Sequence, residues 1–262
     1  MLVFAGFTPS SPLLLPSINE AKMSEVQETR QAFDELAEEL YAVHPDTIII
    51  FSESQTMYSD AFSLNVADPY LASLADYGDL GYQKKYHPDF AFVDRLQRHL
   101  RKTDLPVTLS TDEHLSASTL VPLDILTGHL PNVRILPVAP CDLDAKSHFN
   151  IGVAFKHLIL ESDKRIAVIA AGDMSHALSA TAPAGLHKDG KVFDESVLTM
   201  LREHNASGLL QMSEELIKNA HDTSHRQLCM LIGVLDGMYT TPTVLSYDAP
   251  FGVGYCVANF VL

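Results

Sequence analysis

The sequence has few cysteines and few basic residues, and each shortage excludes a class of protein. The three cysteines, Cys141, Cys229 and Cys256, are widely spaced and form no CxxC pair, which excludes a disulfide framework and a thiolate zinc site. Eighteen Lys and Arg residues stand against 33 Asp and Glu, a formal charge of −15 at pH 7. Such a charge repels phosphate backbones and anionic lipid head groups. We therefore expect no nucleic-acid or membrane partner, and a reducing, cytoplasmic location.

Several targeting and catalytic signatures are also missing. The apolar N-terminus lacks basic residues ahead of its apolar stretch and is interrupted by Pro9, Pro12 and Pro16, so we expect neither a signal peptide nor a membrane helix. The nucleophile-elbow pattern GxSxG is absent, which leaves a serine hydrolase as a minor alternative. The GVG at 252–254 does not extend to GxGxxG, so no nucleotide cofactor is expected.

Alternating apolar runs and helical segments predict the fold class. Runs typical of buried strands alternate with segments of helical spacing along the 262 residues, a pattern typical of a mainly parallel sheet with helices on both faces. We predict a single α/β domain over residues 1–262. The apolar stretches on either side of Pro250 and Gly252 predict a C-terminal strand pair. The predicted strands of the central sheet are 2–7, 47–52, 106–110, 133–139 and 165–171.

The clearest helix is predicted over residues 25–45. Its apolar residues, among them Phe33, Leu36 and Leu40, share one stripe, while its glutamates face away from it. Three further helices are predicted near 191–204, 207–220 and 224–238.

The strand at 165–171 is followed at once by polar residues in GDMSHAL. In open α/β sheets, ligands bind beyond the carboxyl ends of the strands. Asp173 lies three residues before His176, a spacing that lets a carboxylate orient an imidazole. We predict catalytic or binding roles for both, while a capping role for Asp173 remains open. A triad with Ser175 can also be drawn, but neighbours in sequence rarely have the required geometry.

Three other histidines are candidates. His114 follows the strand at 106–110 in a polar cluster, so it too belongs to the carboxyl end of a strand. His221 and His225 are four residues apart and would share one face of a continuous helix, as metal ligands often do. Residues 222–224 are all good N-caps, however, so a break between two helices is the simpler interpretation.

The order of these segments resembles the class III extradiol ring-cleavage dioxygenases, in the branch of the catalytic B subunit, with the Memo-like proteins as relatives. The resemblance spans almost the whole chain. Its most specific motifs are GDMSHAL at 172–178, APAG at 182–185 and VLSYDAPFGVGY at 244–255. Weaker similarities are PSSPLLLPSI at 9–18, PDTIIIFSES at 45–54, DAFSLN at 60–65, DEH at 112–114 and VPLDIL at 121–126.

The resemblance implies a non-haem ferrous iron held by two histidines and a carboxylate. Aligned on the family motifs, Ser10 stands at the first histidine position, Ser54 at the second and Asp222 at the carboxylate position. His176 matches the family's active-site histidine, which implies proton transfer or substrate orientation, and His114 matches a second pocket histidine. Because serine is a poor ligand for iron compared with imidazole, the resemblance implies a degenerate metal site.

Glu53 adjoins Ser54 but is expected to alternate away from it and face solvent if the strand continues. An oxygen-rich metal site built from Glu53, His114, His176 and Asp222 is therefore an alternative to a lost metal.

We expect a pocket at the carboxyl edge of the sheet. The resemblance implies that it takes a small aromatic, catechol-type ligand, and whether the protein is an enzyme stays open. Alternatives are a metal-free, noncatalytic homologue that binds a small molecule or serves as a subunit of a homo- or hetero-oligomer, and a protein-interaction module. The predicted pocket residues are Ser10, Ser54, His114, Asp173, His176 and Asp222.

Overall fold

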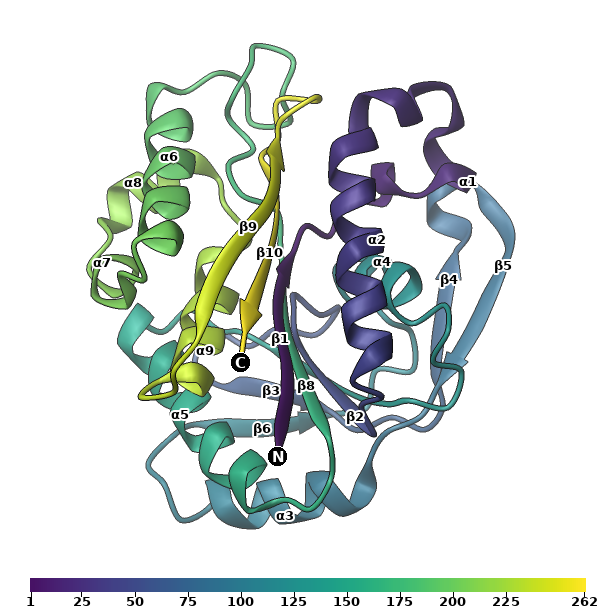
Figure 1. The fold of residues 1–262 in the computed structure, drawn as a ribbon, viewed down its shortest axis with the longest axis vertical. Helices are drawn as coiled ribbons and strands as arrows, with labels where there is room; N and C mark the ends of the chain where they lie inside the picture. The colour runs from purple at the N-terminus through teal and green to yellow at the C-terminus, as the bar shows by residue number, and fades with distance from the viewer.

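Eight strands form one mixed sheet in the computed structural model, which describes residues 1–262 (Figure 1). They are β1 (Leu2–Thr8), β2 (Thr47–Phe51), β3 (Phe62–Asn65), β6 (Val107–Ser110), β7 (Arg134–Ala139), β8 (Ile166–Ala171), β9 (Thr241–Asp248) and β10 (Tyr255–Val261). Their order across the sheet is β6-β3-β7-β2-β8-β1-β10-β9. All five strands predicted for the central sheet, and the C-terminal strand pair, are therefore confirmed.

The centre of the sheet is parallel. Strands β7, β2, β8 and β1 run in the same direction, and each is an apolar run buried on both sides, as central parallel strands require. The C-terminal pair β10 and β9 joins β1 antiparallel. At the other edge, β6 pairs parallel with β3, but β3 pairs antiparallel with β7. The strand that precedes His114 therefore runs opposite to the central strands.

Helices cover both faces of this sheet, as predicted. In Figure 1, α2 and α4 lie on one side of the central strands and α5, α6 and α9 on the other. A separate hairpin of β4 (Tyr70–Leu74) and β5 (Asp79–Tyr86) lies beyond α4. No helix is both long enough and apolar enough to cross a membrane. The α-helices are α1 (Pro16–Asn19), α2 (Gln27–Ala42), α3 (Phe90–Leu100), α4 (Ala117–Leu126), α5 (Ala145–Glu161), α6 (Lys188–Arg202), α7 (Ala206–Leu210), α8 (Glu214–Ala220) and α9 (His225–Leu235).

One of the helix predictions is confirmed in detail and another is wrong. The stripe of Phe33, Leu36 and Leu40 is fully buried on α2, and the glutamates opposite are exposed, as predicted. The single helix predicted over 207–220 is wrong, because α7 ends at Leu210 and α8 begins at Glu214. Ser213 has an extended backbone and precedes two glutamates, a combination that starts a new helix.

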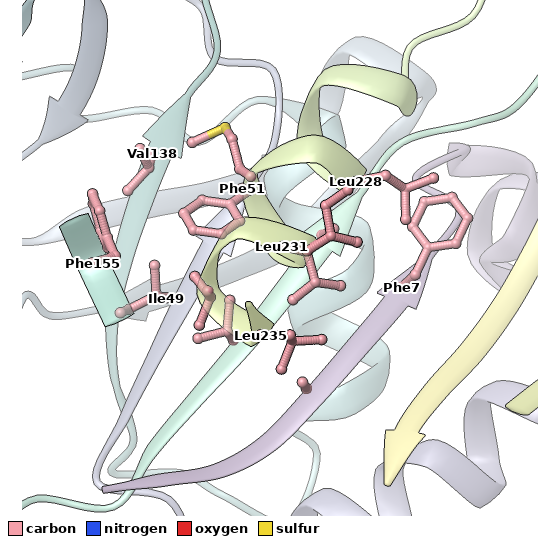
Figure 2. Packing of buried hydrophobic residues seen from close by; sticks show 14 of the residues in the cluster. Phe7, Ile49, Phe51, Val138, Phe155, Leu228, Leu231 and Leu235 are labelled. Carbon is pink, nitrogen blue, oxygen red and sulfur yellow. The ribbon is translucent and has the colours of Figure 1, made fainter. Parts of the chain in front are cut away.

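The α9 helix is packed between the sheet and α5. Leu228, Leu231 and Leu235 of α9 lie against Phe7 and Phe51 of the sheet in one apolar cluster (Figure 2).

On its other side α9 crosses α5 at two glycines. A Cβ added at Gly152 would lie 2.0 Å from the carbonyl oxygen of Met230, and one at Gly233 would lie 2.1 Å from that of Phe149. Only glycine permits so close a backbone approach. This packing fixes the N-terminus of α9, and the residues just before it, relative to the sheet.

Candidate functional site

Three neighbouring parallel strands end at the same edge of the sheet. Ser10 follows β1, Glu53 and Ser54 follow β2, and Asp173 and His176 follow β8. Because β2, β8 and β1 are adjacent, loops from distant parts of the sequence meet at this edge, where α/β proteins bind their ligands.

Asp173 anchors the loop that carries Ser10. The Ser10 N–H donates to Oδ1 of Asp173 at 2.7 Å, and the Ser10 hydroxyl lies 3.5 Å from the same oxygen. Asp173 is only 7% exposed. Its burial raises the pKa of the carboxyl, while the donors of Ser10 and Ser11 and the charge of His176 act in the opposite direction. The structure thus brings Ser10 and Asp173 into direct contact.

His176 is held by its Nδ1 nitrogen. Nδ1 lies 2.8 Å from the carbonyl oxygen of His221, so it carries a proton and donates it. Whenever the ring is neutral, Nε2 is therefore its free acceptor, and it lies 3.8 Å from Oδ2 of Asp173. The Ser175 hydroxyl instead donates to the carbonyl of Ala220 at 3.0 Å. A Ser175 triad is therefore not formed, whereas His176 offers a free imidazole nitrogen beside a carboxylate.

Asp222 caps α9. Its Oδ1 accepts the N–H of Ser224 at 2.7 Å, the hydroxyl of Ser224 at 2.5 Å and the N–H of His225 at 3.0 Å. Burial raises the pKa of the Asp222 carboxyl against these donors.

The same cap separates two histidines. His221 follows α8 as its C-cap residue, in a left-handed conformation with φ of 51°. His225 is buried at the start of α9, and its Nε2 donates to the carbonyl oxygen of Leu209 at 2.7 Å. The helix break at 222–224 is confirmed, and the shared-face zinc site is wrong.

Glu53 lies close to this group. Burial and the nearby charge of Asp222 raise the pKa of its carboxyl, and the charges of His176 and Arg226 lower it. It is half-buried and, with Asp222 and Arg226, lines a cleft of about 610 Å3, so the expectation that it faces bulk solvent is wrong.

The cleft extends from these residues to other elements. Its walls come from α8, the N-terminal end of α5 and the start of α9. His221, whose carbonyl holds His176, also lines it, but Ser10, Ser54, His114 and His176 do not. A depression of about 660 Å3 at the opposite edge, beside Tyr41 and Arg134, contains none of the candidate residues. We place the candidate site by its chemistry rather than by cavity size.

Ser54 and His114 are more exposed than Asp173, and their side chains make no hydrogen bond to the other candidate residues. Ser54 is half-buried next to Glu53, whose carbonyl accepts the Ser116 hydroxyl at 2.6 Å. The His114 side chain is exposed, and its backbone pairs with Leu71 of β4. No hydrogen bond or ion pair joins its imidazole to the other candidates. A pocket role for His114 stays a prediction, as does one for Ser54.

The residues at the family's ligand positions do not fit ferrous iron. They offer two hydroxyls and one carboxylate, and Oδ1 of Asp222 already accepts hydrogen bonds from Ser224 and His225. No three His, Cys, Asp or Glu side chains are arranged so that they could hold a metal ion. Iron prefers imidazole and free carboxylate donors.

Sequence reasoning missed Thr223, Asp194 and Tyr247. Thr223 exchanges hydrogen bonds with the backbone of Asp173 at 3.0 and 3.1 Å. Asp194 accepts from Ser175 and from Tyr247. The only available signal was the presence of Tyr247 in the VLSYDAPFGVGY motif, and nothing in the sequence linked it to α6.

Comparison with known proteins gives three similarities. Residues 5–258 match the family described as the catalytic LigB subunit of aromatic ring-opening dioxygenase. Protein CA_C1420 of Clostridium acetobutylicum is 24% identical over 258 residues, which cover 95% of this chain and 55% of that protein. The chain thus spans about half the length of this curated relative.

A solved structure is similar in fold. It is the crystal structure of the uncharacterized protein JW3007 from Escherichia coli K12, with a TM-score of 0.66 and 17% identity. The match covers 99% of this chain and 100% of that one. At this level of identity the likeness concerns the fold alone.

Proposed function

Because the chain belongs to the family of the catalytic LigB subunit of aromatic ring-opening dioxygenase, we propose that it binds a small aromatic, catechol-type ligand at the carboxyl edge of its sheet with a degenerate iron site. One observation carries this proposal. The family-matched His176 keeps a free imidazole nitrogen beside buried Asp173, while the residues at the ligand positions do not suit iron.

Two features of the side chains support the proposal of a phenolic ligand. Nε2 of His176 can accept the proton of a phenolic hydroxyl, since its Nδ1 is committed to His221. Proton transfer within such a hydrogen bond would make His176 a general base. Glu53 and Asp222, whose pKa values are raised, are the nearby carboxyls that can take up or release a proton.

A second candidate function is that of a noncatalytic subunit. The residues at the ligand positions favour it, because two hydroxyls and a carboxylate that already accepts hydrogen bonds do not suit iron. Mass measurement of the native protein purified under gentle conditions tests this directly.

The main proposal is tested by metal analysis and catechol titration on the same preparation. Protein purified without chelators is expected to contain far less than one iron per chain and to bind catechol in calorimetry with a stoichiometry near one. His176→Ala is expected to lose this binding. Its matched control is His129→Ala, which removes an exposed imidazole at the opposite edge of the sheet. Stoichiometric iron with oxygen consumption would contradict the degenerate site, and absence of catechol binding would contradict the ligand class.

A further inference from the structure

Asp194 is a buried carboxylate that none of the candidate functions uses. It lies on α6 and is 1% exposed. Its Oδ1 accepts the backbone N–H of Ser175 at 2.9 Å, and its Oδ2 accepts the hydroxyl of Tyr247 at 2.6 Å. Ser175 directly precedes His176, so Asp194 contacts the loop one peptide group before the candidate base.

This contact differs from every other hydrogen bond that the backbone N–H groups of residues 172–178 donate. The N–H of Met174 donates to Gly254, and that of His176 to Ala220, both at 2.9 Å. These acceptors, like those of the other loop amides, are neutral carbonyl or hydroxyl oxygens. Asp194 is the single ionisable group that accepts from this backbone, and a bond to an anion is roughly twice as strong as a neutral one.

Asp194 and the Ser175 it contacts are both closely packed. A Cβ added at Gly254 would lie 2.1 Å from Oδ2 of Asp194, and one at Gly190 would lie 2.6 Å from the hydroxyl of Ser175. The carboxylate is thus enclosed between α6, the 172–178 loop and the C-terminal strand pair. A change of charge at Asp194 must therefore be felt by the loop rather than relieved by rotation of the side chain.

We propose that Asp194 is a positioning residue for His176, whose ionised carboxylate holds the 172–178 loop in place and whose protonation loosens it, which makes the candidate site pH-dependent. The link to ligand binding rests on the proposed function, but the coupling of Asp194 to the loop does not.

The burial of Asp194 places this change near pH 6. Burial raises the pKa of Asp194 to about 6, while the donors of Tyr247 and Ser175 and the charge of His176 pull it down and the charge of Asp222 pushes it up. On β10, Cys256 also faces this carboxylate, which helps to raise the pKa of the thiol. The remaining neighbouring charges are Glu195 and Arg202 of its own helix, which act on Tyr247 and Cys256 respectively. Asp194 is accordingly ionised above pH 6 and protonated below it.

The test is a pH titration of backbone amides by NMR on the full chain without ligand or metal. In the wild type, the amide protons of Ser175 and His176 are expected to shift together with a midpoint near pH 6. Tyr247→Phe removes a donor to the carboxylate, so its midpoint is expected to rise by about half a pH unit, the equivalent of one hydrogen bond. Asp194→Asn is expected to abolish the transition. Glu195→Gln, at the exposed neighbouring position, is the matched control and should titrate like the wild type.

Each contrary outcome overturns the proposal. Flat amide shifts between pH 4.5 and 8 in the wild type would do so, as would a transition that persists in Asp194→Asn. If Asp194→Asn does not fold, a titration midpoint in Tyr247→Phe equal to that of the wild type is enough to reject the proposal. A failure of catechol binding leaves this titration interpretable, and a flat titration leaves the proposed ligand untouched, so the two proposals fail separately.

Discussion

The backbone N–H of Ser10 donates a 2.7 Å hydrogen bond to Oδ1 of Asp173, across 163 residues of sequence. The bond uses the backbone of Ser10 and leaves its hydroxyl more loosely held, 3.5 Å from the same oxygen. The position of residue 10 at the site is thus set by Asp173 rather than by the side chain of residue 10. This relationship determines which substitutions the site should tolerate.

Removal of the Asp173 carboxylate should destabilise the protein. In Asp173→Ala the buried N–H of Ser10 loses its acceptor, which costs about 1–3 kcal/mol of unfolding free energy. Asp173→Asn keeps an acceptor oxygen and should cost less. Urea denaturation of both variants measures the difference, and equal stabilities would show that the Ser10 bond contributes nothing.

His176 should matter for binding more than for folding. Its side chain is 21% exposed and makes one hydrogen bond, to His221, so His176→Ala should change the unfolding free energy by no more than about 1–2 kcal/mol. Catechol binding should be lost in the same variant, while His129→Ala binds normally. Calorimetry and denaturation on both proteins separate the two effects, and global unfolding of His176→Ala would favour a purely structural histidine.

Restoring the histidines should restore metal affinity. The double change Ser10→His, Ser54→His rebuilds two imidazoles and one carboxylate around Asp222, and iron affinity should rise at least ~100-fold, with about 10-fold for each restored ligand. Anaerobic iron titration measures it. A double variant that folds but gains no affinity would mean that residues 10 and 54 are not at the ligand positions.

The Asp194 carboxyl should also make stability depend on pH. Its folded pKa of about 6 lies above the ordinary 3.8 because of burial. Protonation loosens the bond to Ser175 but relieves the larger cost of burying the charge, and this contribution to the unfolding free energy is lost as the pH rises through 6. From pH 7 to pH 4 the wild type should gain up to about 3 kcal/mol relative to Asp194→Asn. Urea denaturation across this range, with Glu195→Gln as the control, checks the sign. A wild type that loses stability relative to Asp194→Asn on acidification would contradict it.

The crossing of α5 and α9 should not tolerate a side chain. In Gly152→Ala the new Cβ would lie 2.0 Å from the Met230 carbonyl oxygen, which must force the helices apart at a cost of about 1–3 kcal/mol or more. Gly128→Ala, where a Cβ meets nothing within 4 Å, is the matched control. Thermal unfolding of both variants decides whether the crossing is as tight as described.

Strands and helices with strong local patterns were predictable, and the sheet direction at one edge was not. The apolar runs of β1, β2 and β8 are buried on both faces, so their composition alone identifies them. The direction of the strand that precedes His114 has a topological cause. Nothing in residues 106–110 reveals that β6 pairs with a strand antiparallel to β7.

Part of the site was predictable because it adjoins elements with strong local sequence patterns. Asp173 and His176 follow a recognisable strand, and Asp222 precedes a recognisable helix. Asp194 was not predictable, because its environment comes from Ser175 and Tyr247, which lie 19 and 53 residues away in sequence. On α6 it looks like one of several polar residues of an amphipathic helix, and only tertiary packing distinguishes it.

The place of β1 in the sheet also constrains the order in which the strands can pair during synthesis. β1 lies between two strands that follow it in the chain, β8 and β10, with Leu2 paired to Ile166 on one side and Gly6 to Asn259 on the other. During synthesis this apolar strand has neither of its two neighbours until β8 (Ile166–Ala171) has emerged, and it stays unpaired on its other side until β10 (Tyr255–Val261) follows. Such an unpaired strand is a site for aggregation or for a chaperone. The contact of Ser10 with Asp173 can form only after β8 has emerged, so any binding activity should appear only then.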